Sequence, residues 1–171
     1  ELGHAFAMMR HGIEPGISLH MLGGLTSWSG GHKLSRRSRI FISFAGPLAG
    51  FILGGTVYAV QAAAPEAFVT MPAHVLLAVR LLEYVNIFWG LINLIPVLPL
   101  DGGHILEDVL GPKRERTTAI ISIVTGALVV LFAAANNQWW IAILFGMLSF
   151  QTFQRLQANS SPQSRESSEP L

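Results

Sequence analysis

The chain has 171 residues, of which 51% are hydrophobic and only 12% are charged, and it contains no cysteine. Soluble domains carry about a quarter charged residues, so this composition favours a membrane protein. The net charge of +1 excludes a nucleic-acid-binding protein. The lack of cysteine excludes disulfides, iron–sulfur sites and thiolate zinc sites, so any metal must bind imidazole or carboxylate groups.

The first 39 residues contain an apolar segment and a turn signal. Residues 1–9 are predicted to be the remnant of a transmembrane helix. Since the chain begins with Glu rather than Met, it is expected to be incomplete at its N-terminus. Two short runs, 17–22 and 25–28, then flank a Gly-Gly pair. Two glycines can both adopt positive φ in a tight turn, which predicts a small re-entrant or interfacial β-hairpin. An irregular interfacial loop is the alternative.

The rest of the chain is dominated by long apolar segments. Crossing a bilayer takes about 20 apolar residues in a helix. Segments that approach or exceed this length are residues 40–64, 73–100, 119–135 and 139–153. The first has glycines at positions 46, 50 and 54, a spacing that lets membrane helices approach closely. The predicted fold is an all-α polytopic membrane protein with about four to five transmembrane helices.

Lysines and arginines cluster in alternate connections between these segments. They lie before the first full span and after the second, whereas residues 61–72 and 136–138 contain none. Since cytoplasmic loops of membrane proteins are enriched in Lys and Arg, loops 10–39 and 104–117 and the C-terminal tail are predicted to be cytoplasmic. We expect one membrane-embedded core over residues 1–156 and a disordered polar tail over residues 157–171.

The end of the second span carries an ionisable residue. Asp101 follows Pro96 and Pro99 and precedes two glycines. A carboxylate at the end of an apolar helix is costly and by default marks a functional site lining a cavity. The alternative is a polar loop that leaves the membrane, with Asp101 as the N-cap of the next helix.

A second pair of polar residues lies at the start of the chain. Glu1 and His4 are three residues apart and therefore share one helical face. A carboxylate beside an imidazole suits zinc hydrolysis, in which one group binds metal and the other accepts a proton from water. The pattern Glu-x-x-His alone is weak, because the complete signature His-Glu-x-x-His needs a further His before Glu1.

Together, the two segments resemble the site-2 protease family of intramembrane zinc metalloproteases. Glu1 and His4 match the last part of the family's His-Glu-x-x-His motif. The family's Asn-x-x-Pro-x-x-Pro-Leu-Asp-Gly motif is matched at every specified position, namely Asn93, Pro96, Pro99, Leu100, Asp101 and Gly102. The segment Ala45-Gly-Pro47 and the Gly-Gly turn are also similar to family features. The resemblance covers roughly residues 1–110.

The resemblance implies a role for each matching residue. His4 and Asp101 would be ligands of one catalytic zinc ion, and Glu1 would be the general base that activates the zinc-bound water. Asn93 would hydrogen-bond the substrate backbone or the developing oxyanion. His104 would orient Asp101, or would simply be a polar residue at the start of a helix. With one ligand missing, these 171 residues alone are expected to bind zinc weakly and to show little or no proteolysis.

A stripe of four residues runs along the second span. Glu83, Asn86, Gly90 and Asn93 recur at intervals of three and four, which places them on one helical face. One interpretation is a hydrated path from the membrane surface to Asp101. The other is a helix-packing seam in which Glu83 pairs with Arg80.

The predicted function is zinc-dependent hydrolysis of peptide bonds in or near the transmembrane segments of other membrane proteins. The implied partners are a transmembrane protein substrate and the lipid bilayer, and the implied location is a prokaryotic inner membrane. Two alternatives stay open. One is a catalytically silent relative that binds membrane proteins, and the other is a small ion transporter that uses Asp101, Glu83 and Asn93. Neither the substrate nor the oligomeric state follows from the sequence.

Overall fold

The computed structural model describes residues 1–20, 23–28 and 34–158. They divide into two units, Glu1–Leu94 and Ile95–Leu171, each with its own internal packing. Of the expected disordered tail, residues 157–171, the positions from 159 onward lie outside the described residues. Its first two residues belong to the last helix, which continues to Ala158.

The described residues of the first unit form four helices and two strands. Their bounds are α1 Leu2–Arg10, β1 Pro15–His20, β2 Gly23–Trp28, α2 Arg36–Ala63, α3 Pro65–Val69 and α4 Ala73–Asn93. The two strands are antiparallel, and their register places Pro15 opposite Trp28 and His20 opposite Gly23. Whether this segment is re-entrant or interfacial stays a prediction.

Helix α1 packs against the start of α2 through small residues. A Cβ on Gly3 would lie 2.8 Å from the Cβ of Ala49 and would also overlap the Ala45 carbonyl, so only glycine allows this approach. Next to this contact, Ala7, Met8, Ile13 and Ile42 form a buried apolar cluster. Burial of these side chains fixes α1 on the first turns of α2.

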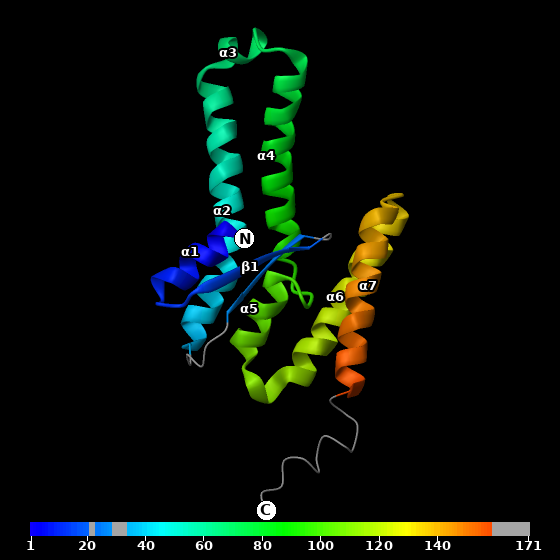
Figure 1. The fold of residues 1–171 in the computed structure, drawn as a ribbon. Helices are drawn as coiled ribbons and strands as arrows, with labels where there is room; N and C mark the ends of the chain where they lie inside the picture. Colours follow the sequence, from blue (N-terminus) through cyan, green and yellow to red (C-terminus); the bar gives the residue numbers. More distant parts are fainter. Residues whose placement is uncertain (21–22, 29–33, 159–171) are drawn as a thin grey trace, which may run out of the picture. The chain divides into compact units, whose positions relative to one another are not determined.

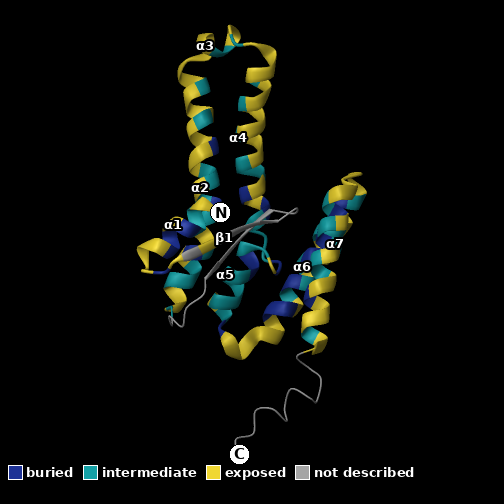
Figure 2. Cartoon of the chain, viewed as in Figure 1, coloured by how far each residue is buried: buried dark blue, intermediate teal, exposed yellow. Residues whose placement is uncertain are grey.

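Helices α2 and α4 form a long pair (Figure 1). Gly50 lies against the Asn86 backbone, Gly54 against Ile87 and the Glu83 carbonyl, and Gly90 against the Phe51 ring. This is the close approach that the glycine spacing in α2 predicts. The outer surfaces of the pair are largely exposed and apolar (Figure 2), as in Ile52 and Leu91. Such a surface suits lipid contact.

In the second unit, the described residues 95–158 form three α-helices and one short 3-10 turn. Their bounds are α5 Asp101–Leu110, η1 Pro112–Arg114, α6 Glu115–Ala135 and α7 Trp139–Ala158. Helices α6 and α7 pack closely where Gly126 of α6 faces Ser149 of α7. The Phe145 side chain of α7 is fully buried. The segment 95–100, which precedes α5, has its Val97 and Leu98 side chains buried.

Among the described residues, three helices are long and apolar enough to cross a membrane: Arg36–Ala63, Ala73–Asn93 and Pro112–Ala135. The predicted number of about four to five is not reached on this criterion. Helix α7 has the length, but its second half carries Gln151, Gln154, Arg155 and Gln157, which lower its apolar character. Helix α1 has only 9 residues here.

Two helix bounds have identifiable physical reasons. Helix α4 ends at Asn93, in agreement with the break expected at Pro96 and Pro99 near the end of the segment 73–100, because prolines cannot donate to a helical ladder. Helix α2 begins at Arg36, four residues before the apolar run, because the Ser35 side chain accepts a hydrogen bond from the Ser38 amide and caps the helix.

Candidate metal centre

His4 lies on α1 with its ring fixed by α2. Its Nδ1 is 2.8 Å from the Ile42 carbonyl oxygen. A carbonyl can only accept, so Nδ1 must be the protonated nitrogen in this bond. In the neutral ring, Nε2 then carries the lone pair, which is the form of histidine that binds a metal.

Gly46 provides the space for the His4 ring. A Cβ at this position would overlap the ring, lying 2.7 Å from Cδ2 and closer to Nε2. Helix α2 therefore contacts His4 at two places, since the Ile42 carbonyl accepts its Nδ1–H and Gly46, about one turn later, lies against the ring.

Glu1 stands at the N-cap position of α1, and its carbonyl oxygen accepts the hydrogen bond of the Ala5 amide at 3.0 Å. It is exposed, whereas His4 is half-buried. Glu1 therefore directly precedes α1, and His4 lies in the first turn of that helix. The predicted roles of the two side chains stay predictions.

Asp101 is the first residue of α5, and Leu100 takes the N-cap position. The N-cap interpretation of Asp101 is therefore wrong, and the carboxylate is in the first turn of the helix, where the helix dipole favours negative charge. Gly102 and Gly103 behind it are buried. A Cβ on Gly103 would lie 2.6 Å from the Leu98 amide nitrogen, so α5 starts directly against the loop that precedes it.

Asn93 and His104 occupy the ends of two helices. Asn93 is the last residue of α4. The Nδ1 of His104 lies 3.5 Å from Glu107 Oε2, and Glu107 Oε1 accepts a hydrogen bond from Arg155 of α7 at 3.2 Å. His104 thus belongs to a polar cluster that joins α5 to α7, and its predicted role beside Asp101 stays a prediction.

The available donor set suits zinc, because imidazole nitrogen and carboxylate oxygen are the ligands found in hydrolytic zinc sites. Glu1, His4 and Asn93 belong to the first unit, whereas Asp101 and His104 belong to the second. Within the described ranges, no three His, Asp or Glu side chains form a group able to hold a metal ion. The roles of these residues therefore stay predictions.

His11, at the end of α1, has a backbone partner. The Nδ1 of His11 lies 2.8 Å from the Ala7 carbonyl oxygen at the end of α1.

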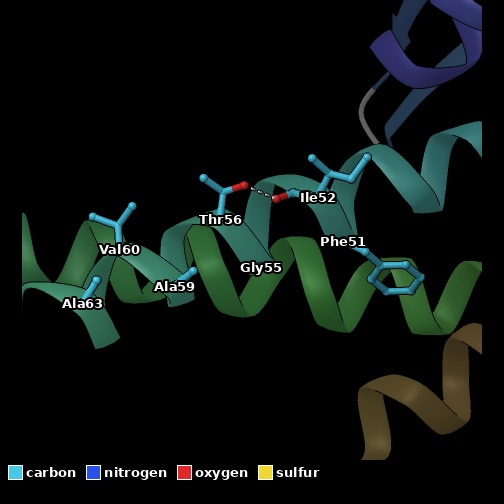
Figure 3. A pocket seen from close by; sticks show the side chains of 7 residues that line it. All are labelled: Phe51, Ile52, Gly55, Thr56, Ala59, Val60 and Ala63. Atoms are coloured by element: carbon cyan, nitrogen blue, oxygen red, sulfur yellow. Dashed lines mark hydrogen bonds between the residues drawn. The ribbon is translucent and has the colours of Figure 1, made fainter.

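A shallow depression on α2 is lined by neutral side chains, among them Ile52, Thr56 and Val60 (Figure 3). Its one drawn hydrogen bond runs from the Thr56 hydroxyl to the Ile52 carbonyl within the same helix, at 2.7 Å. This surface offers no group for hydrolysis.

Three groups that contact His4 or the loop before Asp101 were not predicted from the sequence. They are the Ile42 carbonyl that orients His4, and the hydroxyls of Ser122 and Thr152, which contact the loop before Asp101. A backbone carbonyl leaves no signal in a sequence. Buried hydroxyls within apolar helices are a weak signal, because they usually bond to their own helix.

Comparison with known proteins links these features to one family. Residues 69–132 match the family model described as Peptidase family M50. A putative zinc metalloprotease, Rip3, of Mycobacterium tuberculosis is 36% identical over 84% of this chain and 39% of its own length. A zinc metalloprotease of Methanocaldococcus jannaschii is 29% identical over 87% of this chain and 40% of its own length.

The solved structure of the site-2 protease from Methanocaldococcus jannaschii is similar over 91% of this chain and 71% of that one, with 27% identity and a TM-score of 0.62. The chain spans about two fifths of the length of the curated relatives described above. The predicted resemblance is confirmed by these matches, which agree in family and in fold.

Proposed function

We propose that this chain, which matches peptidase family M50 over residues 69–132 and resembles a site-2 protease in fold, forms part of a zinc-dependent intramembrane protease. Its substrates are membrane proteins, which it cleaves in or near their transmembrane segments. Because the chain spans about two fifths of its curated relatives, this activity is proposed for the whole protein to which it belongs.

The observation that carries the proposal is the orientation of His4. Its Nδ1 donates to the Ile42 carbonyl, and its ring lies on Gly46. A histidine held by Nδ1 against a carbonyl is typical of metal ligands, because this bond fixes both the tautomer and the ring plane. Asp101, at the start of α5, is the carboxylate proposed as the second ligand from this chain.

The proposed chemistry divides among three side chains. A zinc ion bound by His4 and Asp101 would lower the pKa of a bound water towards neutrality. Glu1 would accept the proton of the attacking water and pass it to the departing amine, which is the work of a general base and then of a general acid. The Asn93 amide would donate a hydrogen bond to the carbonyl oxygen of the substrate as negative charge develops on it.

The setting of the reaction is proposed to be a prokaryotic inner membrane, with loops 10–39 and 104–117 on the cytoplasmic side. Three apolar helices of sufficient length support membrane insertion. The distribution of Lys and Arg supports the orientation. A substrate helix would have to unwind near the zinc, because a peptide bond within a helix is shielded by its own hydrogen bonds.

The proposal is tested by assaying the detergent-purified full-length protein on a reconstituted transmembrane substrate. Replacing Glu1→Gln keeps size and polarity but removes the base, so cleavage should fall by about 10²- to 10⁴-fold. A zinc chelator should abolish cleavage by the wild type, and added zinc should restore it. Cleavage that survives both treatments would contradict a zinc-dependent mechanism with Glu1 as the base.

A further inference from the structure

The loop before Asp101 is bound by two helices at a single residue. The Leu98 amide donates a hydrogen bond to Ser122 Oγ of α6 at 3.3 Å. The Thr152 hydroxyl of α7 lies 3.1 Å from the Leu98 carbonyl oxygen and 3.0 Å from the Leu148 carbonyl oxygen of its own helix, so its single proton is shared between the two. Both backbone polar groups of Leu98 therefore lie within hydrogen-bond distance of side-chain hydroxyls from different helices.

This arrangement is buried. Relative exposure is 0% for Ser122, 3% for Thr152 and 4% for Leu98. A buried backbone amide or carbonyl without a hydrogen bond destabilises the fold, and nearby prolines remove the possibility of a helical ladder. The two hydroxyls thus supply the bonds that the broken backbone needs at this position.

The loop is connected rigidly to Asp101. The Leu100 amide bonds to the Val97 carbonyl at 2.8 Å, and the His104 amide bonds to the Leu100 carbonyl at 3.1 Å. Gly103 lies so close to Leu98 that a Cβ there would be 2.6 Å from its amide nitrogen. A shift of Leu98 must therefore displace the first turn of α5, which carries Asp101.

We propose that Ser122 and Thr152, here called the hydroxyl clamp, are positioning residues for Asp101 and set the affinity of the metal centre. This inference rests on the proposed function, because it treats Asp101 as a zinc ligand. The clamp does not touch the metal. It acts through the Leu98 backbone and the start of α5, as residues that orient a metal ligand from behind usually do.

The experiment uses the full-length protein in detergent and measures zinc affinity by competition with a chelator. Thr152→Val and Ser122→Ala should each weaken zinc binding by about tenfold or more, which is the usual effect of losing such a support. Substituting Co²⁺ gives a second readout, because its visible absorption reports the geometry of the ligands. Both variants should alter this spectrum, and Thr152→Ser should restore affinity and spectrum.

The chain offers matched controls for both changes. Thr118 on α6 has 0% exposure and donates within its own helix to the Arg114 carbonyl at 3.2 Å, so Thr118→Val removes an equally buried hydroxyl without touching the loop. Ser149 on α7 has a buried hydroxyl with no hydrogen-bond partner among the described residues, which makes Ser149→Ala the control for Ser122→Ala. Both controls should keep wild-type zinc affinity.

Three outcomes would overturn the clamp. The first is zinc affinity and a Co²⁺ spectrum that do not change in Thr152→Val and Ser122→Ala. The second is an equal loss in the control variants, which would indicate general packing of α6 and α7. The third is a failure of Asp101→Ala to weaken zinc binding in the same assay, which would overturn the clamp and the proposed function together.

Discussion

His4 depends on two residues of α2 that contribute no side-chain chemistry. The Ile42 carbonyl accepts its Nδ1–H, and Gly46 leaves room for its ring. Such support explains how a residue on a helix of 9 residues can hold a fixed orientation. It also assigns a physical reason to the glycine in the Ala45-Gly-Pro47 segment.

This reasoning predicts that Gly46→Ala weakens zinc binding by about tenfold or more, because the added Cβ displaces the imidazole. The matched control is Gly55→Ala on the same helix, where a Cβ meets nothing within 4 Å. That change should leave zinc affinity unchanged, since alanine is the better helix former. Equal zinc affinity of the Gly46→Ala variant and the wild type, measured by chelator competition, would show that the ring does not depend on this contact.

At the scale of single residues, the sequence predicts candidate site residues but not the groups that hold them in position. The motif around Asp101 can be recognised from its spacing, whereas the Glu1–His4 pair is a weak signal unless it is combined with that motif. The partners that hold them cannot, because Ile42 acts through its backbone and Thr152 lies 54 positions from Leu98. Long-range contacts of this kind appear only when the helices are packed together.

At the scale of elements, the stripe on α4 proves to be a packing seam along much of its length. Asn86 and Gly90 lie against Gly50 and Phe51 of α2. Glu83 Oε2 accepts a hydrogen bond from Gln61 of α2 at 2.6 Å, a partner other than the Arg80 that the packing-seam interpretation gives it. A helical wheel identifies which residues share a face, but it does not identify the helix that this face meets.

The Gln61–Glu83 bond predicts a stability effect that does not involve the metal. Gln61→Leu should lower the free energy of unfolding by about 1.5–3 kcal/mol, because it leaves a half-buried carboxylate without this charge-assisted bond. Thr56→Val is the control, since the exposed Thr56 hydroxyl bonds only within α2. The measurement is thermal unfolding in detergent. An unchanged midpoint for Gln61→Leu would mean that water replaces the bond at no cost.

Helix ends follow rules that counting apolar residues does not capture. The apolar run 73–100 is a helix only to Asn93, because the prolines interrupt it. In the other direction, α2 extends beyond its apolar run to Arg36, because Ser35 caps a polar first turn. Composition predicted the membrane-spanning segments, and capping and proline chemistry set where they begin and end.

At the scale of the whole molecule, the three candidate spans and the family match describe an integral membrane protein. Under the proposed function, His4 of α1 and Asp101 of α5 would be ligands of one zinc ion. Neither residue alone makes a hydrolytic site, because a catalytic zinc ion takes three protein ligands and leaves one position open.

The most direct test is the zinc content of the purified full-length protein and of three single variants. If His4 and Asp101 are ligands and Glu1 is the general base, about one zinc ion per chain is expected in the wild type and in Glu1→Gln, because a general base is not a ligand. His4→Ala and Asp101→Ala should each lose most of the metal while the protein stays folded. Full zinc content in either ligand variant, or loss of zinc in Glu1→Gln, would contradict the assignment of these residues.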